Sequence, residues 1–301
     1  MLGQYLITFR EGLEAALIIM IVLAYLERTK RGHLLRYVWY GVLLAIITSF
    51  ILGISIWLVY GGISKSAKTL FEGVAALIAV GVLTSMIFWM ATKGKEIKGE
   101  VEQRLDSITS SGMMLGLISF AFIAVFREGL ETVLFLTPFL MEDAAPTILG
   151  ALIGIATSMI FSYFIFVVGM KINIRRFFYF TSILLVLLAA GLIGYGVHEL
   201  VEYSGGSEIG WLGEYAYDLN IPKEHIMHHK GVIGSILAVM FGYTVSAEWA
   251  RVIVHISYLV VFLPLVLWFY ENQTIIFFVE KTKSIIHRII PLKKRREHVI
   301  R

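Results

Sequence analysis

Seven long apolar stretches divide this chain of 301 residues. Hydrophobic residues make up 58% of the sequence and charged residues only 16%, which is typical of a polytopic membrane protein. A helix needs about 20 residues to cross a hydrocarbon core about 30 Å thick, and each stretch is long enough. We therefore predict an all-α fold with seven transmembrane helices, at residues 5–26, 37–60, 69–92, 113–140, 147–170, 177–203 and 251–270.

The basic residues predict how these helices are oriented. Lys and Arg are concentrated in segments 27–36, 93–112 and 171–176 and in the tail after Glu280, whereas the alternate loops hold only four lysines, Lys65, Lys68, Lys223 and Lys230. Because positive loops stay in the cytoplasm, we expect the N-terminus outside and the C-terminus in the cytoplasm. The formal net charge of +4 has the same origin, and we expect no nucleic-acid partner.

One hexapeptide occurs twice, as Phe-Arg-Glu-Gly-Leu-Glu at 9–14 and again at 126–131. The copies fall in the first and fourth predicted helices. Since an odd number of helices separates the two halves, the second half would be inserted upside down relative to the first, as in an inverted repeat of two three-helix halves plus a seventh helix. We expect one transmembrane domain over 1–301, with repeat one at about 1–92 and repeat two at about 113–203. An outer loop follows at 204–246, and the seventh helix with a basic cytoplasmic tail covers 247–301.

Each copy of the hexapeptide places three charges in an apolar segment. Such charges are costly in a membrane, and by default they indicate an ion or substrate path. Two glutamates three residues apart share one face of a helix. The candidate metal-binding residues are Glu11, Glu14, Glu128 and Glu131. Arg10 and Arg127 offset part of their charge and leave about −2, which favours a divalent or trivalent cation. Gly12 and Gly129 allow close helix approach.

The remaining candidates carry weaker patterns. The chain has no cysteine, so carboxylate oxygen and imidazole are its strong metal ligands. An acidic outer vestibule is expected from Glu72, His198, Glu199 and Glu202. His225, His228 and His229 have a spacing that would suit a metal on a helix, although a solvated loop is favoured. For Met86 and Met90, packing is favoured over a role as soft-metal ligands. A purely structural Arg–Glu clamp is the alternative for the repeated cluster.

These motifs resemble those of a known family, the oxidase-dependent iron transporter family of fungal high-affinity iron permeases and their bacterial relatives. The likeness rests on the paired Arg-Glu-Gly-Leu-Glu motifs. It extends to Phe-Glu-Gly-Val-Ala-Ala at 71–76, Met-Ile-Phe-Trp-Met at 86–90, His-Glu-Leu at 198–200 and Phe-Gly-Tyr at 241–243. The resemblance covers nearly the whole chain, and the extra soluble domain that some bacterial relatives carry is not expected here.

The resemblance implies a permease that imports iron across the plasma membrane, with the four glutamates in the place of the family's iron-binding residues. Iron would be cargo, and no permanently bound cofactor is expected. The partner would be an extracytoplasmic iron oxidase or iron-delivery protein. The sequence leaves open whether the ion is Fe³⁺ or Fe²⁺. The alternatives are a transporter of another divalent cation, such as Mn²⁺ or Pb²⁺, and a di-iron membrane enzyme.

Overall fold

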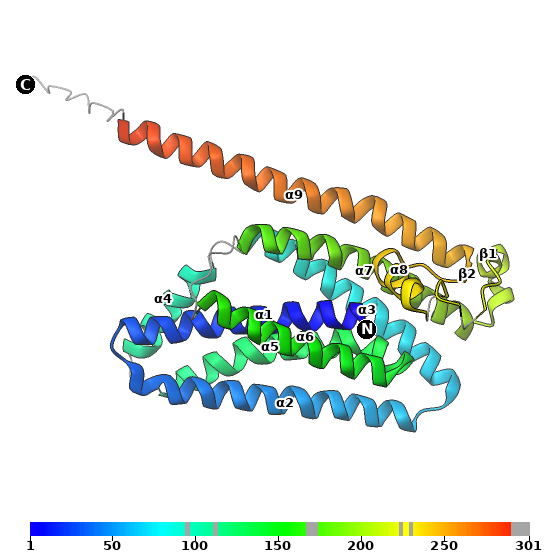
Figure 1. Ribbon diagram of the computed structural model, residues 1–301, viewed down its shortest axis with the longest axis horizontal. Helices are drawn as coiled ribbons and strands as arrows, with labels where there is room; N and C mark the ends of the chain where they lie inside the picture. Colours follow the sequence, from blue (N-terminus) through cyan, green and yellow to red (C-terminus); the bar gives the residue numbers. More distant parts are fainter. Residues whose placement is uncertain (94–96, 111–113, 167–173, 223–224, 229–230, 290–301) are drawn as a thin grey trace, which may run out of the picture.

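The computed structural model describes residues 1–93, 97–110, 114–166, 174–222, 225–228 and 231–289. Most of this part of the chain is helical, and the long helices lie side by side along the long axis of the molecule, with α9 along one edge (Figure 1). The helices are α1 (Leu2–Arg28), α2 (Leu35–Gly62), α3 (Lys65–Lys93), α4 (Ile97–Ser110), α5 (Met114–Glu142), α6 (Ala144–Phe166), α7 (Ile174–Tyr203), α8 (Val232–Phe241) and α9 (Trp249–Ile289). The strands are β1 (Tyr215–Asp218) and β2 (Ser246–Glu248).

Five helical segments in the described part of the chain are long and apolar enough to cross a membrane: Gly32–Gly62, Lys65–Ala91, Ala144–Ile165, Phe178–Tyr203 and Trp249–Glu271. They overlap five of the seven predicted helices, so the prediction of an all-α membrane protein is confirmed at that level. The other two predicted spans correspond to α1 and α5, which have 27 and 29 residues. Each carries the three charges of a hexapeptide near its middle, which lowers its apolar character.

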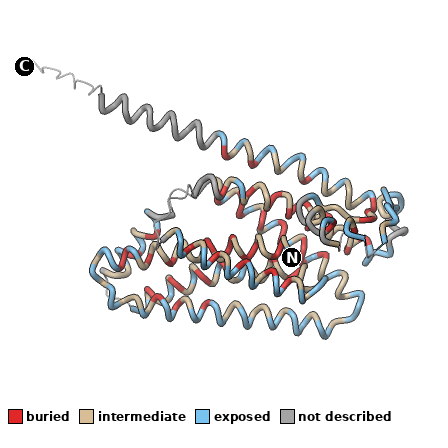
Figure 2. Tube along the Cα trace, in the orientation of Figure 1, coloured by how far each residue is buried: buried red, intermediate tan, exposed pale blue. Residues whose placement is uncertain are grey.

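The buried apolar residues form two clusters. One joins α3, α7 and α9 with Ile7 of α1 and Phe135 of α5. The other joins α1, α2, α4 and α5, and it includes Leu26 of α1 and Leu117 of α5. Figure 2 shows the buried positions concentrated on the inward faces of the bundle. Along both α1 and α5, the hexapeptide therefore lies between one apolar cluster and the other.

The closest helix pairs are α1 with α6, α2 with α5 and α3 with α7. Small residues let these backbones approach. A Cβ added to Gly150 of α6 would lie 2.8 Å from the carbonyl oxygen of Met1, and one added to Gly41 of α2 would clash with the carbonyl oxygen of Ile118 in α5. Close backbone approach at small residues is how helices associate inside a membrane, where the hydrophobic effect does not drive them together.

The structure differs from the sequence prediction at three places. The charged segment 93–112 contains the helix α4, whose buried Val101 and Leu105 pack with α1 and α5. This amphipathic helix was missed because its exposed face is charged and glycine breaks up the segment. α9 continues past residue 270 to Ile289, where its sequence turns charged. The end of the fifth predicted span, 167–170, lies outside the described residues.

The third difference is a small sheet in an otherwise helical fold. β1 pairs antiparallel with β2, with Tyr215 opposite Glu248 and Asp218 opposite Ser246. The pairing ties the segment after α7 to the start of α9. The apolar run 231–244 forms α8, which has only 10 residues and is too short for an ordinary span, as its length predicted.

Candidate functional site

The two hexapeptides meet where α1 packs against α5. Glu11, Glu128 and Glu131 each present one carboxylate oxygen to a common point, and these three oxygens lie within 4.8 Å of one another. Glu11 is 1% exposed and Glu128 is 2% exposed. Oxygen ligands of one transition-metal ion lie up to about 4.4 Å apart, since each bond is about 2.0–2.2 Å long. Three such ligands spaced evenly around one ion lie at most about 3.8 Å apart, so an approach of up to about 1 Å would let all three hold one ion.

Several of these buried oxygens have no hydrogen-bond partner. Among the described residues, both carboxylate oxygens of Glu128 and one each of Glu11 and Glu131 are buried without one. Buried polar groups in native proteins are nearly always satisfied, and an unsatisfied carboxylate is especially costly. Mutual repulsion among three close carboxylates adds to this cost. The cluster therefore has the donor chemistry of a cation site.

Glu14 does not belong to this group of three, and its carboxylate pairs with Arg10, as that of Glu11 also does. The Arg10 guanidinium is buried, with Nη1 2.6 Å from Glu11 Oε1 and Nη2 2.7 Å from Glu14 Oε1. The same Nη1 also donates to Met86 Sδ at 3.0 Å. Arg10 is thus enclosed by two carboxylates of its own helix and a thioether from α3.

Arg127 has different surroundings, although its hexapeptide is identical. Its Nε donates to Glu131 Oε1 at 3.2 Å and lies 3.3 Å from Glu128 Oε1. Its side chain is 43% exposed, against 3% for Arg10. The guanidinium carbon lies 4.8 Å from the centroid of the Trp89 ring, in a cation–π arrangement. The two copies are therefore alike in sequence and unlike in environment.

The glycines of the hexapeptides face serines on other helices. A Cβ at Gly12 would meet Ser158 of α6, and one at Gly129 would meet Ser49 of α2, in both cases with the serine Oγ too close. The prediction that these glycines allow close helix approach agrees with this geometry. Each glycine adjoins a glutamate of the cluster, so the approach also fixes where that glutamate lies.

The residues expected in an outer vestibule are only partly brought together. Glu72 of α3 accepts hydrogen bonds from the hydroxyls of Tyr60 and Tyr195, the second at 2.8 Å. Glu199 is buried one turn after Tyr195, and Glu202 is exposed. The sequence does not single out the two tyrosines, because tyrosines near helix ends are ordinary interfacial residues.

His198 turns away from that group toward the small sheet. Its Nδ1 donates to Glu248 Oε1 at 3.0 Å. Glu248 lies before the span that α9 provides. Although burial alone would raise the pKa of Glu248, the hydrogen bond from His198 and nearby positive charge bring it below its ordinary value. His198 therefore links α7 to β2.

His225 and His228 do not lie on a helix, which the predicted metal-ligand spacing assumed. Residues 225–228 form a turn, His225 Nδ1 accepts the Met227 amide at 3.1 Å, and His228 is buried. His229 lies outside the described residues.

Met86 and Met90 are buried, at 6% and 3% exposed, as expected for side chains that pack in the core. The hydrogen bond to Met86 was not foreseeable, since nothing in the sequence places α3 beside Arg10.

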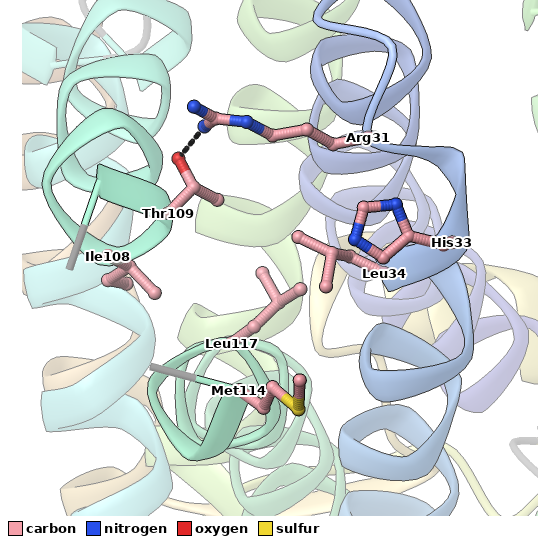
Figure 3. A pocket seen from close by; sticks show the side chains of 7 residues that line it. All are labelled: Arg31, His33, Leu34, Ile108, Thr109, Met114 and Leu117. Atoms are coloured by element: carbon pink, nitrogen blue, oxygen red, sulfur yellow. Dashed lines mark hydrogen bonds between the residues drawn. The ribbon is translucent and has the colours of Figure 1, made fainter. Parts of the chain in front are cut away.

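A cavity of about 200 Å³ lies apart from the glutamates. Figure 3 shows Arg31 pointing toward Thr109 of α4, to which it is hydrogen-bonded. Its lining residues are Arg31, His33, Leu34, Ile108, Thr109, Met114 and Leu117. Among the described residues that line this cavity there is no carboxylate.

The fold and the cluster define a class of protein, namely a helical membrane protein with a candidate metal-binding site inside its bundle. Comparison with known proteins gives the family. The model of the iron permease FTR1 family matches residues 1–267. The chain belongs to this family, and it is an iron-transporting membrane permease rather than an enzyme.

Relatives match over most of their length. An uncharacterized protein of Archaeoglobus fulgidus is 46% identical over 269 residues, which cover 88% of this chain and 94% of the relative. A protein of Yersinia pestis named ferrous iron permease EfeU is 34% identical, covering 86% of this chain and 91% of the relative. EfeU of Escherichia coli O6:K15:H31 is 35% identical over 86% of this chain and 93% of the relative. No solved structure matches.

Proposed function

We propose that this protein imports Fe²⁺ across the plasma membrane through a single site formed by the two hexapeptides. The observation that carries the proposal is the convergence of Glu11, Glu128 and Glu131, with buried oxygens that lack hydrogen-bond partners. Glu14 completes the set of four carboxylates and holds Arg10 beside the ion. A clamp that pins two helices together would pair an arginine of one helix with a carboxylate of the other, whereas Arg10 and Arg127 each pair with the glutamates of their own helix.

Charge favours the ferrous ion. Four glutamates and two arginines give the site a charge of about −2 when all are ionised, and Fe²⁺ neutralises it. Fe³⁺ would leave a net positive charge in a region of low dielectric constant, where an uncompensated charge is costly. The relatives from Y. pestis and E. coli are named ferrous iron permeases, which supports the same choice.

We also propose that α1 and α5 cross the membrane and that the chain is an inverted repeat with seven spans. Support comes from contacts that recur between the halves. Gly41 of α2 faces Ile118 and Ala121 of α5, while Gly150 of α6 faces Met1 and Gln4 of α1. The two copies of the hexapeptide are 117 residues apart, and residues 117 positions before Ile118 and Ala121 are Met1 and Gln4. The glycines of α2 and α6 thus face equivalent positions in the two halves.

The same relation holds around the hexapeptide glycines and in the third helix pair. Gly12 faces Ser158 and Gly129 faces Ser49, so each half donates the serine that meets the other half's glycine. In α3 and α7, a Cβ on Gly73 or on Gly196 would meet the backbone oxygen of the other. Such reciprocal contacts are expected of two halves related by a pseudo-two-fold axis.

The proposed orientation places the N-terminus and the loop 204–246 outside and the tail in the cytoplasm. That loop is where an iron oxidase or iron-delivery protein would dock. Because the chain has no cysteine, single cysteines report each side directly. Ser66→Cys and Ser107→Cys are both at exposed positions. In intact cells an impermeant maleimide should label Ser66→Cys and not Ser107→Cys. Labelling of Ser107→Cys would mean that the orientation is the opposite of the proposed one.

The site itself is tested by uptake of radiolabelled Fe²⁺ into proteoliposomes under reducing conditions. Glu11→Gln keeps the shape of the side chain and removes its charge, and uptake should fall by at least about tenfold, as ligand-shell changes usually do. Glu27→Gln is the matched control, because it makes the same change at an exposed position of the same helix. Full uptake by folded Glu11→Gln protein would refute the site.

A further inference from the structure

Met86 has a polar contact that packing does not require. Its side chain is buried in α3, and its Sδ accepts a hydrogen bond from Arg10 Nη1 at 3.0 Å. A thioether is a weak acceptor, and a guanidinium ordinarily finds an oxygen. Met90, one helical turn further on, is equally buried in the apolar cluster of α3, α7 and α9. One of the two methionines thus faces the charged site.

Arg10 Nη1 lies between Met86 and the glutamate cluster. This nitrogen is 2.6 Å from Glu11 Oε1 and 3.0 Å from Met86 Sδ, so the oxygen and the sulfur are at most about 5.6 Å apart. Two ligand atoms on one transition-metal ion lie up to about 4.4 Å apart. An approach of about 1 Å would close the difference, and methionine has three rotatable side-chain bonds with which to make it.

We propose that Met86 is a specificity-determining ligand of the transported ion. The positively charged Nη1 occupies the place of the cation between Glu11 and Met86. When the ion enters, Arg10 gives up its contacts to Glu11 and Met86 and keeps its bond to Glu14. The ion is then bound by Glu11, Glu128, Glu131 and the sulfur of Met86. This inference rests on the proposed function, because it adds a ligand to that site.

The sulfur supplies a preference that carboxylates alone do not. Carboxylates suit Mg²⁺ and Mn²⁺ well, whereas a thioether is a soft ligand that favours later and more polarisable metal ions. In the Irving–Williams order Fe²⁺ directly follows Mn²⁺, so a site of oxygen ligands separates the two only weakly. A neutral sulfur also leaves the charge balance of the site unchanged. Met86 would thus favour Fe²⁺ without changing the total charge.

The test compares Met86→Leu with Met90→Leu in proteoliposomes, with radiolabelled Fe²⁺ as the transported ion and Mn²⁺ as the competitor. Leucine fills a similar volume and removes only the sulfur. In Met86→Leu the preference for Fe²⁺ over Mn²⁺ should fall by about tenfold, the lower end of the usual effect of changes around a metal site. In Met90→Leu it should stay at the parent value. If Met86 only positions Arg10, uptake of both ions falls together, the ratio stays unchanged, and the proposal is overturned.

A second measurement detects the sulfur directly. Iron-edge X-ray absorption of Fe²⁺-loaded parent protein should show one sulfur neighbour that is absent in Met86→Leu and present in Met90→Leu. A shell of oxygen alone in the parent would overturn the proposal. Neither outcome bears on the glutamates, because Glu11→Gln in the same uptake assay tests them separately. Loss of iron selectivity with intact uptake thus separates this inference from the function on which it rests.

Discussion

Adding one methyl group at Gly129 should loosen the bundle at the ion site. In Gly129→Ala the new Cβ would clash with Ser49 Oγ and lie 2.8 Å from Ser49 Cβ on α2. The hydroxyl can rotate away, since Ser49 Oγ has no hydrogen-bond partner that would hold it. The Cβ cannot move without moving α2. At Gly12 the corresponding distance to Ser158 Cβ is 3.2 Å, so only the hydroxyl of Ser158 is seriously in the way.

This difference in distance determines how much stability each Gly→Ala variant should lose and which second substitution should restore it. Overpacking of a tight interface typically costs about 1–3 kcal/mol, and Gly129→Ala should fall in that range. Ser49→Gly should rescue it because no Cβ remains, and the gain in helix propensity at 129, about 1 kcal/mol, would more than offset the loss at 49, about 0.5 kcal/mol. Ser49→Ala should not rescue it. For Gly12→Ala, by contrast, Ser158→Ala should suffice, because the remaining Cβ can give by a few tenths of an ångström.

The assay is thermal unfolding in detergent, followed by Fe²⁺ uptake at a temperature where every variant is folded. Gly129→Ala should unfold at a lower temperature than Gly12→Ala and should transport less. The reasoning is refuted if Gly129→Ala unfolds at the parent temperature, or if Ser49→Ala restores it as well as Ser49→Gly does. The first result would mean that α2 and α5 are not in tight contact at this point, and the second that only the hydroxyl of Ser49, and not its Cβ, obstructs the new methyl group.

Three further predictions concern charged groups. Glu11→Gln and Glu128→Gln should each weaken Fe²⁺ binding, and the double variant should be little worse than the weaker single one, because ligands of one ion are not additive; two separate binding events in the parent would instead mean two sites. Arg127→Lys should lower uptake, since an ammonium cannot replace the planar fork beside two carboxylates, and parent-like uptake would reduce Arg127 to a counter-charge. Glu248→Gln should destabilise the protein at pH 7. Because the pKa of Glu248 is lowered by folding, this contribution to stability is present above pH 4.5 and disappears as the pH falls through the folded-state pKa. If the unfolding midpoints of the parent and Glu248→Gln differ by the same amount at pH 7 and at pH 4, the assignment to the pair of His198 and Glu248 is contradicted.

The sequence allowed much of this architecture to be predicted, because lipid imposes long apolar segments and penalises charge within them. Both hexapeptides could be singled out as a candidate site for that reason. Five spans are found where they were expected, with boundaries that differ by a few residues. The small sheet of β1 and β2 could not be foreseen, since its strands are 31 residues apart in the chain from Tyr215 to Ser246 and only four and three residues long.

The internal arrangement of the site could not be predicted from the sequence, for a different reason. The spacing of Glu11 and Glu14 predicts a shared helix face, but it does not say which carboxylate turns to the other helix. In the structure Arg10 pairs with both glutamates and with Met86 of a distant helix, and Glu11 is the one that also approaches Glu128 and Glu131. Identical hexapeptides also predict identical surroundings, and the structure gives Arg10 and Arg127 different ones because α3 presents a methionine to the first and a tryptophan to the second.

The unequal surroundings of the two arginines have a consequence for movement. In the inverted repeat that we propose, the two halves would exchange their conformations during transport, and the exchanged form would have Arg127 enclosed by its glutamates and Arg10 at the surface. In an inverted repeat, this exchange turns the opening of the site from one side of the membrane to the other, which is alternating access. The conformation described here would then be one end of a transport cycle, and the other end would be the same protein with the roles of its two arginines reversed.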